Sequence, residues 1–186
     1  MEREFKDIVK VLGEAKRRKF IRDFALTGAL ALSALSQPRA TRDIDILISL
    51  EKEKIKSFVE WLKYSKEYKL AKHHAGRPKD RIKNLIEVPA GNTWVDIIVA
   101  SSEVEEEAIS TSLSVSAFTG VKLKVVRPEY LIILKLLAGS DQDYLDSAQL
   151  WNESIDKRLV RKMVKELFLQ GKLQKMTVIA RRLLAR

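Results

Sequence analysis

The chain contains no cysteine, which excludes disulfide bonds, thiolate metal sites and cysteine nucleophiles. It also has no long apolar run, since YLIILKLLAG, residues 130–139, is interrupted by Lys135 and is too short to cross a bilayer. The opening residues MEREFKDIVK lack the apolar core of a signal peptide. We therefore expect a cytoplasmic protein with no membrane-spanning segment.

Internal repeats and low-complexity linkers are absent as well. With 46% hydrophobic and 32% charged residues, the composition is typical of a folded globular protein and not of a disordered one. The 186 residues are enough for one domain with a real hydrophobic core, or for one such domain with a small helical appendage.

The net charge of +10 is distributed unevenly along the chain. Lys and Arg outnumber Asp and Glu by eight to four in residues 1–22, by eight to two in residues 63–83, and by ten to two in residues 155–186. A basic periphery therefore surrounds an acidic middle. Basic surfaces attract polyanions such as nucleic acid. The alternative is a solvated surface rich in Lys and Glu, as in thermophiles.

The spacing of apolar residues predicts mixed strands and helices up to residue 127 and helices alone after it. The expected helices before Pro128 are 2–22, 28–36 and 52–69, and the expected strands are 23–27, 43–49, 84–88, 94–100, 113–118 and 121–126. Residues 73–81 are expected to form a basic loop, and helices are expected from Pro128 to Gly139, over 141–151, 156–169 and 172–185. This order predicts an α+β (mixed α/β) domain, residues 1–127, with a C-terminal helical region, residues 128–186, packed on it.

Two aspartates interrupt the apolar strand DIDILIS, residues 43–49. Asp43 and Asp45 point to the same face of a strand, so their carboxylates repel each other and raise each other's pKa. A divalent cation such as Mg²⁺ removes this penalty, because it prefers carboxylate oxygens. Asp96 is a third lone acid, in the apolar strand WVDIIVA, and it joins the pair if the two strands are neighbours. Three such carboxylates suit phosphoryl or nucleotidyl transfer with two metal ions. The alternative is a turn role for Asp43 and a hairpin-end role for Asp96.

A glycine turn precedes the aspartate strand. Thr27, Gly28 and Ala29 join a short strand to a helix, and Gly28 allows the backbone to approach a ligand closely. The helix that follows presents its first backbone amides, which form a candidate phosphate cradle.

These elements together resemble the polymerase-β-type nucleotidyltransferase superfamily, and within it the minimal group that includes the AbiEii-type toxins of abortive-infection systems. The Arg-x-Thr-x-Asp-x-Asp pattern of that group is matched by Arg39, Thr41, Asp43 and Asp45. A later pattern of the group is matched by Pro128, Glu129, Leu131, Lys135, Ala138, Gly139, Asp143 and Asp146. The resemblance covers about residues 20–150, and the ordered combination is more specific than the Asp-x-Asp motif alone.

The resemblance implies a role for each matched position. Asp43, Asp45 and Asp96 would bind Mg²⁺ or Mn²⁺, and Asp96 would help to deprotonate the attacking hydroxyl. The candidate nucleotide-binding residues are Thr27, Gly28, Ala29, Arg39, Thr41 and Lys135. The family usually has Gly or Ser where this chain has Ala29, which keeps the backbone N–H but has no hydroxyl donor.

Other conspicuous side chains have simpler interpretations. Lys135 is either a lysine at a helix edge or a contact to nucleotide or carboxylate. Asp143 and Asp146 are expected to be structural. His73 and His74 are expected to be exposed, with at most a contact to nucleic acid. The tryptophans are expected to pack in the core or at its edge; these are Trp61, Trp94 and Trp151.

The resulting functional hypothesis is a metal-dependent enzyme that moves an NMP from an NTP to a hydroxyl of RNA, tRNA, a protein or a small molecule. By resemblance, it is expected to be the toxin of a toxin–antitoxin or abortive-infection system, with a cognate antitoxin. RNA is expected to bind the basic segments 63–83 and 155–186. The alternative is a non-catalytic member that binds nucleotide or RNA. A DNA-binding regulator is disfavoured, since no helix-turn-helix pattern is present.

Overall fold

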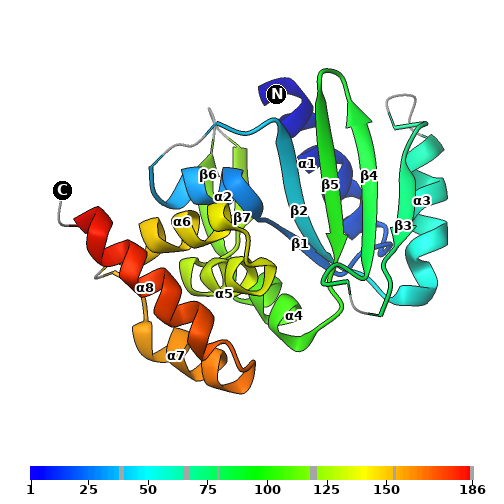
Figure 1. The fold of residues 1–186 in the computed structure, drawn as a ribbon. Helices are drawn as coiled ribbons and strands as arrows, with labels where there is room; N and C mark the ends of the chain where they lie inside the picture. The colour runs from blue at the N-terminus through cyan, green and yellow to red at the C-terminus, as the bar shows by residue number, and fades with distance from the viewer. Residues whose placement is uncertain (38–39, 65–67, 79, 118–120, 153, 185–186) are drawn as a thin grey trace.

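The structure is a computed structural model that describes all residues except 38–39, 65–67, 79, 118–120, 153 and 185–186. In this described part of the chain, seven strands form one mixed sheet. The order across the sheet is β3-β4-β5-β2-β1-β7-β6 (Figure 1). The strands are β1 Asp23–Leu26, β2 Asp43–Ser49, β3 Lys72–Ala75, β4 Asn84–Ala90, β5 Thr93–Val99, β6 Leu113–Ala117 and β7 Val121–Val125. β2 and β5 pair in parallel, as do β1 and β7, and the other neighbours are antiparallel. The predicted mixed α/β class is confirmed.

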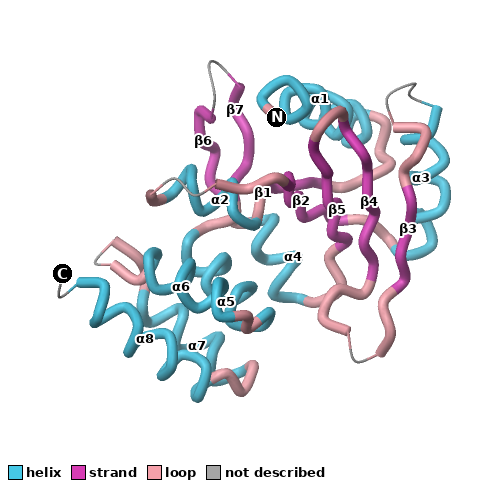
Figure 2. The backbone as a smooth tube through the Cα atoms, turned by 45° about the horizontal axis from the view of Figure 1, so that its top comes forward, coloured by secondary structure: helices cyan, strands magenta, loops and turns pink. Residues whose placement is uncertain are grey.

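The helices form two groups around this sheet (Figures 1 and 2). α1 and α3 lie together on one side of the β3-β4-β5-β2 half, whereas α5 to α8 form a cluster beside the other half. The described helices are α1 Glu2–Arg17, α2 Gly28–Leu35, α3 Ile55–Tyr64, α4 Glu103–Ser110, α5 Pro128–Ala138, α6 Asp141–Leu150, α7 Lys157–Glu166 and α8 Gln170–Leu184. No described helix is long and apolar enough to cross a membrane.

β2 shows why the sheet has one apolar and one mixed face. Ile44, Ile46 and Ile48 are at most 1% exposed, while Asp45 is half-buried and Asp43 is exposed on the alternate positions. Side chains alternate between the faces of a strand, so the isoleucines join the core and the aspartates occupy the other face. The predicted strand 43–49 is therefore confirmed, including its bounds.

Two predicted segments differ from the structure. The expected loop 73–81 begins inside an edge strand, because Lys72–Ala75 pairs with β4. All four of its residues are exposed, so no apolar alternation marks this strand in the sequence. The expected helix 52–69 is a 3₁₀ turn, Lys52–Lys54, followed by the shorter α3, and residues 65–67 lie outside the described part.

The C-terminal region is helical, as its pattern predicted. α5 starts with Pro128, buries most of its side chains and ends before Gly139, whose φ of +74° is left-handed. α6 packs against both α5 and α8, and α7 packs against α5. The division into a catalytic domain of residues 1–127 and a helical region of residues 128–186 remains a prediction.

Candidate active site

The parallel pairing of β2 with β5 aligns the predicted aspartates. Asp45 lies opposite Asp96, and Asp43 lies opposite Trp94. Residues in register on parallel strands point to the same face, so the three aspartates share one face of the sheet. The Thr93 hydroxyl donates a hydrogen bond to the Arg42 carbonyl and ties the start of β5 to that of β2. The prediction that strand 43–49 lies beside strand 94–100 is confirmed.

The aspartates do not form a ready-made metal cluster. Among the described residues, no three Asp, Glu, His or Cys side chains are arranged to hold a metal ion. Like charges on neighbouring strands repel, and the charges of Asp45 and Asp43 act on Asp96 in this way. Their chemistry nevertheless fits Mg²⁺ or Mn²⁺, which bind carboxylate oxygens and commonly use only one or two protein carboxylates. The strands β2 and β5 supply the carboxylate donors on one face of the sheet.

Asp96 carries the clearest electrostatic signature of the site. Burial, together with the charges of Asp45, Glu87 and Asp43, raises the pKa of Asp96 to about 6. Glu87 lies opposite Asp96 on β4, and its Oε2 lies 2.5 Å from Nε2 of His74. The row of acids therefore continues across a third strand. Sequence reasoning missed Glu87, although it is also a single acid among apolar strand residues.

Gly28 and Asp45 form one structural unit. Gly28 has a φ of +65°, and a Cβ atom built on it would lie 1.9 Å from Oδ2 of Asp45. The Thr27 N–H also donates a hydrogen bond of 3.0 Å to the Asp45 carbonyl. Only glycine fits here, for its backbone angle and for the absence of a side chain. α2 begins at this residue without a side-chain cap, which leaves its first amides available to an anion.

A cavity of about 340 Å³ opens beside this unit. The residues that line it come from three parts of the chain: Thr27, Gly28, Ala29, Thr41, Asp43 and Asp45; Arg81, Ile82 and Ile98; and Leu131, Leu134, Lys135, Ser140, Gln142 and Asp143. Five of the predicted nucleotide-binding residues are thus brought to one cavity. Arg39 lies outside the described residues, and Asp96 lies one strand further along the sheet.

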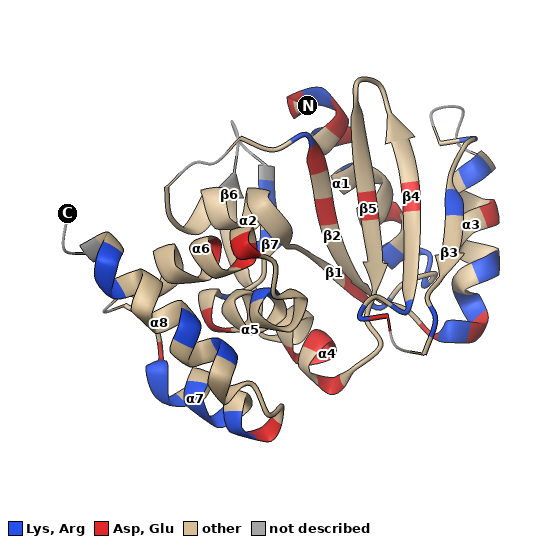
Figure 3. Cartoon of the chain, viewed as in Figure 1, with Lys and Arg blue, Asp and Glu red and all other residues tan. Residues whose placement is uncertain are grey.

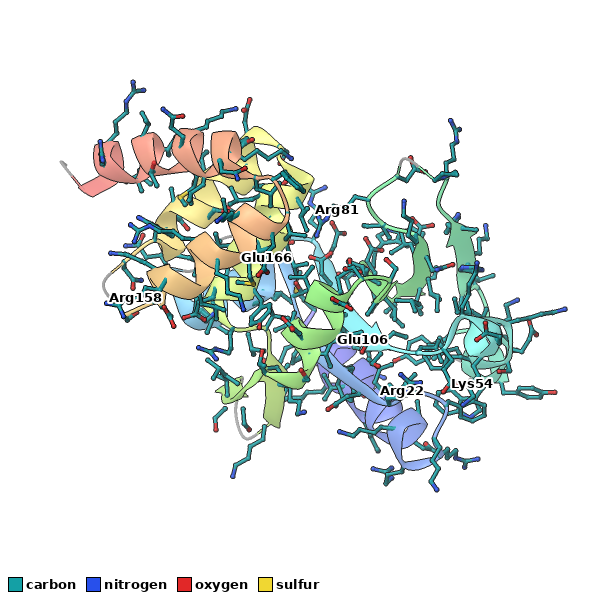
Figure 4. The ribbon with its side chains drawn as sticks, turned by 90° about the horizontal axis from the view of Figure 1, so that it is seen from below. Arg22, Lys54, Arg81, Glu106, Arg158 and Glu166 are labelled. Carbon is teal, nitrogen blue, oxygen red and sulfur yellow. The ribbon has the colours of Figure 1, made fainter. Side chains whose placement is uncertain are left out.

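Arg81 is the cationic residue of the cavity that sequence reasoning missed. It comes from the connection between β3 and β4 and lies between the sheet and the C-terminal helices (Figure 4). Loss of hydration lowers the pKa of Arg81, and the charges of Glu105 and Asp143 oppose that change. An arginine remains charged under such a shift. The basic composition of residues 73–81 was a signal, but the sequence did not show that this loop reaches the cavity.

Lys135 makes the carboxylate contact that was one of its two interpretations. Its Nζ lies 2.6 Å from Oδ2 of Asp146 and 3.5 Å from Oδ1 of Asp143. Asp146 is completely buried, and its Oδ1 accepts a hydrogen bond of 2.7 Å from Gln142. Asp143 also forms a capping box with Ser140 at the start of α6. The structural interpretation of both aspartates agrees with these contacts.

The tryptophans and histidines are mostly placed as expected. Trp61 stacks on Phe20 with a centroid distance of 5.1 Å, and Trp151 packs against the core. Trp94 is different, because it is 51% exposed on the face that carries Asp96. The expectation that Trp94 packs in the core or at its edge was therefore wrong, because Trp94 occupies the solvent-facing register of β5 and does not pack against the core. His73 and His74 are exposed on β3.

The family comparison covers nearly the whole chain. Residues 10–183 match the family described as nucleotidyl transferase AbiEii toxin, Type IV TA system. The chain belongs to this family. Nucleotidyl transfer is therefore its class of activity, and the predicted resemblance is confirmed. No curated protein sequence matches the chain significantly.

Solved structures give the fold context of this AbiEii family member. A crystal structure of ANT(2'')-Ia in complex with adenylyl-2''-tobramycin has a TM-score of 0.50 and 15% identity, covering 96% of this chain and 98% of that one. A solution structure of the antibiotic-resistance factor ANT(2'')-Ia has a TM-score of 0.46 and 18% identity, covering 96% and 90%. A Thermotoga maritima protein described as a nucleotidyltransferase has a TM-score of 0.47 and 14% identity, covering 87% and 94%. The crystallographic likeness to ANT(2'')-Ia supports the nucleotidyltransferase fold.

Proposed function

We propose that the protein transfers an NMP from an NTP to a hydroxyl group and requires Mg²⁺ or Mn²⁺. One observation carries the proposal: Asp45, in register with Asp96, packs directly against the Gly28 turn that begins α2. Carboxylates for a cation and amides for a phosphate therefore adjoin each other at the cavity.

Asp43, Asp45 and Asp96 would hold the cation. A cation bound there neutralises phosphate charge and orients the attacking and leaving oxygens. The first amides of α2, from Gly28 and Ala29, would donate hydrogen bonds to the phosphates. Arg81, on the cavity wall, would add positive charge where pyrophosphate charge develops.

Asp96 is the proposed general base. Without a cation, burial and the neighbouring acids raise the pKa of Asp96 to about 6, so this carboxylate is ionised at neutral pH, and a bound cation favours the ionised form further. It would accept the proton of the acceptor hydroxyl as that oxygen attacks the α-phosphorus. Trp94 is exposed on the same face of β5, where it would be accessible to an acceptor.

RNA is the proposed acceptor, and a toxin–antitoxin system is the proposed context. The family description names a toxin of a Type IV system, which implies a cognate antitoxin. Lys and Arg are concentrated on α3 and on α7 and α8, at opposite ends of the molecule, with acidic bands on β2, β5 and β4 between them (Figure 3). A polyanion bound by both ends would pass across the catalytic face.

A second acceptor class is favoured by Glu87. The fourth acid in the row extends negative charge beyond the three aspartates, toward the acceptor side. Such a surface attracts polycationic hydroxyl compounds, and the similar ANT(2'')-Ia structure contains adenylyl-2''-tobramycin. The non-catalytic alternative, in which Ala29 weakens the phosphate grip, predicts nucleotide binding without turnover.

Label transfer tests these alternatives together. The protein is incubated with each α-³²P-labelled NTP and Mg²⁺, and with total tRNA, an aminoglycoside or no added acceptor. Label on tRNA supports the proposal, and label on the aminoglycoside supports the second acceptor class. Binding of an NTP without transfer to any acceptor supports the non-catalytic alternative. Equal NTP affinity with Mg²⁺ and with EDTA, measured by calorimetry, would exclude the metal site.

A further inference from the structure

A second cavity, of about 420 Å³, lies among α6, α7 and α8, away from the aspartates. Its lining residues are Trp151, Asn152, Lys157, Arg161, Thr177, Ala180 and Arg181. The cavity thus combines an aromatic ring, polar groups and three cationic side chains, and none of the described residues that line it is acidic. This combination is typical of a site for a phosphate and its adjoining base.

The arginines of this cavity are available to a ligand. Within the described residues, neither Arg161 nor Arg181 forms an ion pair or a side-chain hydrogen bond, and both are exposed. The nearby acid Asp156 is occupied, because its carboxylate accepts hydrogen bonds from the backbone N–H groups of Arg158 and Leu159 at 3.0 Å. Within the described part of the chain, the guanidinium groups of Arg161 and Arg181 are therefore not neutralised by an acidic side chain.

Buried side chains of α7 and α8 pack close to the cavity, and Trp151 forms its aromatic wall. Ala180, which lines the cavity, is 2% exposed, and Val160 and Met176 on the same two helices are fully buried. Trp151 is half-buried, and Lys157 Nζ lies 5.7 Å from its ring centroid. An ordered indole beside cations offers stacking to a base and charge to a phosphate without rearrangement of the backbone.

Helix electrostatics alone does not explain this arrangement. Arg181 stands in the last turn of α8, where a cation stabilises the helix dipole. Arg161 stands in the middle of α7, where that effect is weak, yet it lines the same cavity. The helix dipole therefore accounts for the position of Arg181 only, whereas both Arg161 and Arg181 line the same cavity.

We propose that this cavity binds one nucleotide unit of an RNA strand, with Arg161 and Arg181 on the phosphate and Trp151 against the base. The site holds the acceptor RNA at a distance from the catalytic aspartates, and in this respect it rests on the proposed function. A strand is favoured over a free nucleotide because exposed cations continue along both helices beyond the cavity (Figure 3), namely Arg158, Lys162, Lys165 and Arg182.

Fluorescence anisotropy with a labelled single-stranded RNA of about 12 nucleotides tests the proposal. The double variant Arg161→Gln and Arg181→Gln should bind at least about tenfold more weakly, and the slope of log K against log salt should fall by about 0.7, the value for one lost phosphate contact on a single strand. The control variant Lys10→Gln and Arg17→Gln removes the same charge from exposed positions of α1 and should leave the slope unchanged.

Three results would overturn the proposal. These are an equal loss of affinity in both double variants, a parent protein that fails to bind RNA at low salt, and displacement of RNA by free AMP at the same concentration as by unlabelled strand. A change in tryptophan fluorescence on RNA binding that disappears in Trp151→Phe supports it, and an unchanged signal in that variant contradicts it.

The outcome is separable from that of the proposed function. Mg²⁺-dependent NTP binding, followed by calorimetry, should be the same in the Arg161→Gln and Arg181→Gln variant as in the parent. If the parent transfers no nucleotide but the arginine variant loses RNA affinity, the proposed reaction fails while the RNA site stands.

Discussion

Asp146 and Asp45 are both acids among apolar residues, but the groups that surround their carboxylates differ in charge. Asp146 is fully buried and is compensated by Lys135 at 2.6 Å and by Gln142 at 2.7 Å. Asp45 lies next to the like charge of Asp96 and against the backbone of Gly28. The first acid is stabilised by the fold itself. The second lies beside the like charge of Asp96, and a bound cation would offset the repulsion between the two carboxylates.

This difference separates a structural acid from a candidate catalytic one. When the partner of a buried charge is removed, the free energy of unfolding of the protein falls. An acid held near other acids raises the free energy of the folded state, so its removal relieves repulsion. Stability and activity should therefore respond in opposite directions at the two places.

The largest expected effect is on activity at Asp45. Asp45→Asn keeps the shape but removes one carboxylate from the candidate cation site, so nucleotidyl transfer should fall about a thousandfold. In EDTA the variant should be as stable as the parent or more stable, because repulsion from Asp96 decreases. Label transfer and thermal melts measure the two quantities. A lower melting temperature in EDTA would contradict the assignment and favour a structural role.

Asp146 should show the reverse behaviour. Asp146→Ala leaves Lys135 buried without its main partner, so the free energy of unfolding should fall by about 3 kcal/mol. Denaturation in urea, with and without Mg²⁺, measures this loss. Asp141→Ala is the control, because its ion pair with Lys175 is exposed and contributes less than about 1 kcal/mol. Equal losses in both variants would remove the distinction between the two acids.

The next prediction concerns the cationic side chain of the candidate site, Arg81. Arg81→Gln should raise KM for the NTP about tenfold, since charge-assisted hydrogen bonds to phosphate contribute about 1.5 kcal/mol. Arg77→Gln, in the same connection but lining a different cavity, should leave KM unchanged. Steady-state kinetics at saturating acceptor provides the measurement. If both variants raise KM equally, the loop acts through its general charge.

The smallest effect concerns the pH dependence of stability at Asp96. Its folded-state pKa of about 6 lies above the ordinary 3.8, so the folded protein binds the extra proton and its stability falls as pH rises from 3.8 to 6. In EDTA at pH 7, Asp96→Asn should therefore stabilise the fold by about 1 kcal/mol after allowance for solvent screening. Melts of both proteins across this pH range test it, and parallel curves would show that Asp96 is not perturbed.

Much of the fold was predictable because its signals are local. The alternation in residues 43–49, the Pro128 start and the Gly139 end of α5 each depend on a few neighbouring residues. The edge strand β3 was missed because its exposed residues have no apolar partner face. Its existence depends on the hydrogen-bonding edge of β4, which lies elsewhere in the chain.

The sequence by itself determined the chemistry of the candidate site: the paired aspartates, the glycine turn and the lone acid of β5 are readable from residue type and spacing. Only the tertiary structure decided which groups share that site. In the folded protein, Arg81 lines the cavity and Glu87 pairs with Asp96 across neighbouring strands. Lys135 donates a hydrogen bond to Asp146, and Trp94 is exposed to solvent. The physical reason is that a local pattern fixes which face of its own element a side chain occupies. The groups opposite that face come from strand pairing and helix packing between distant segments.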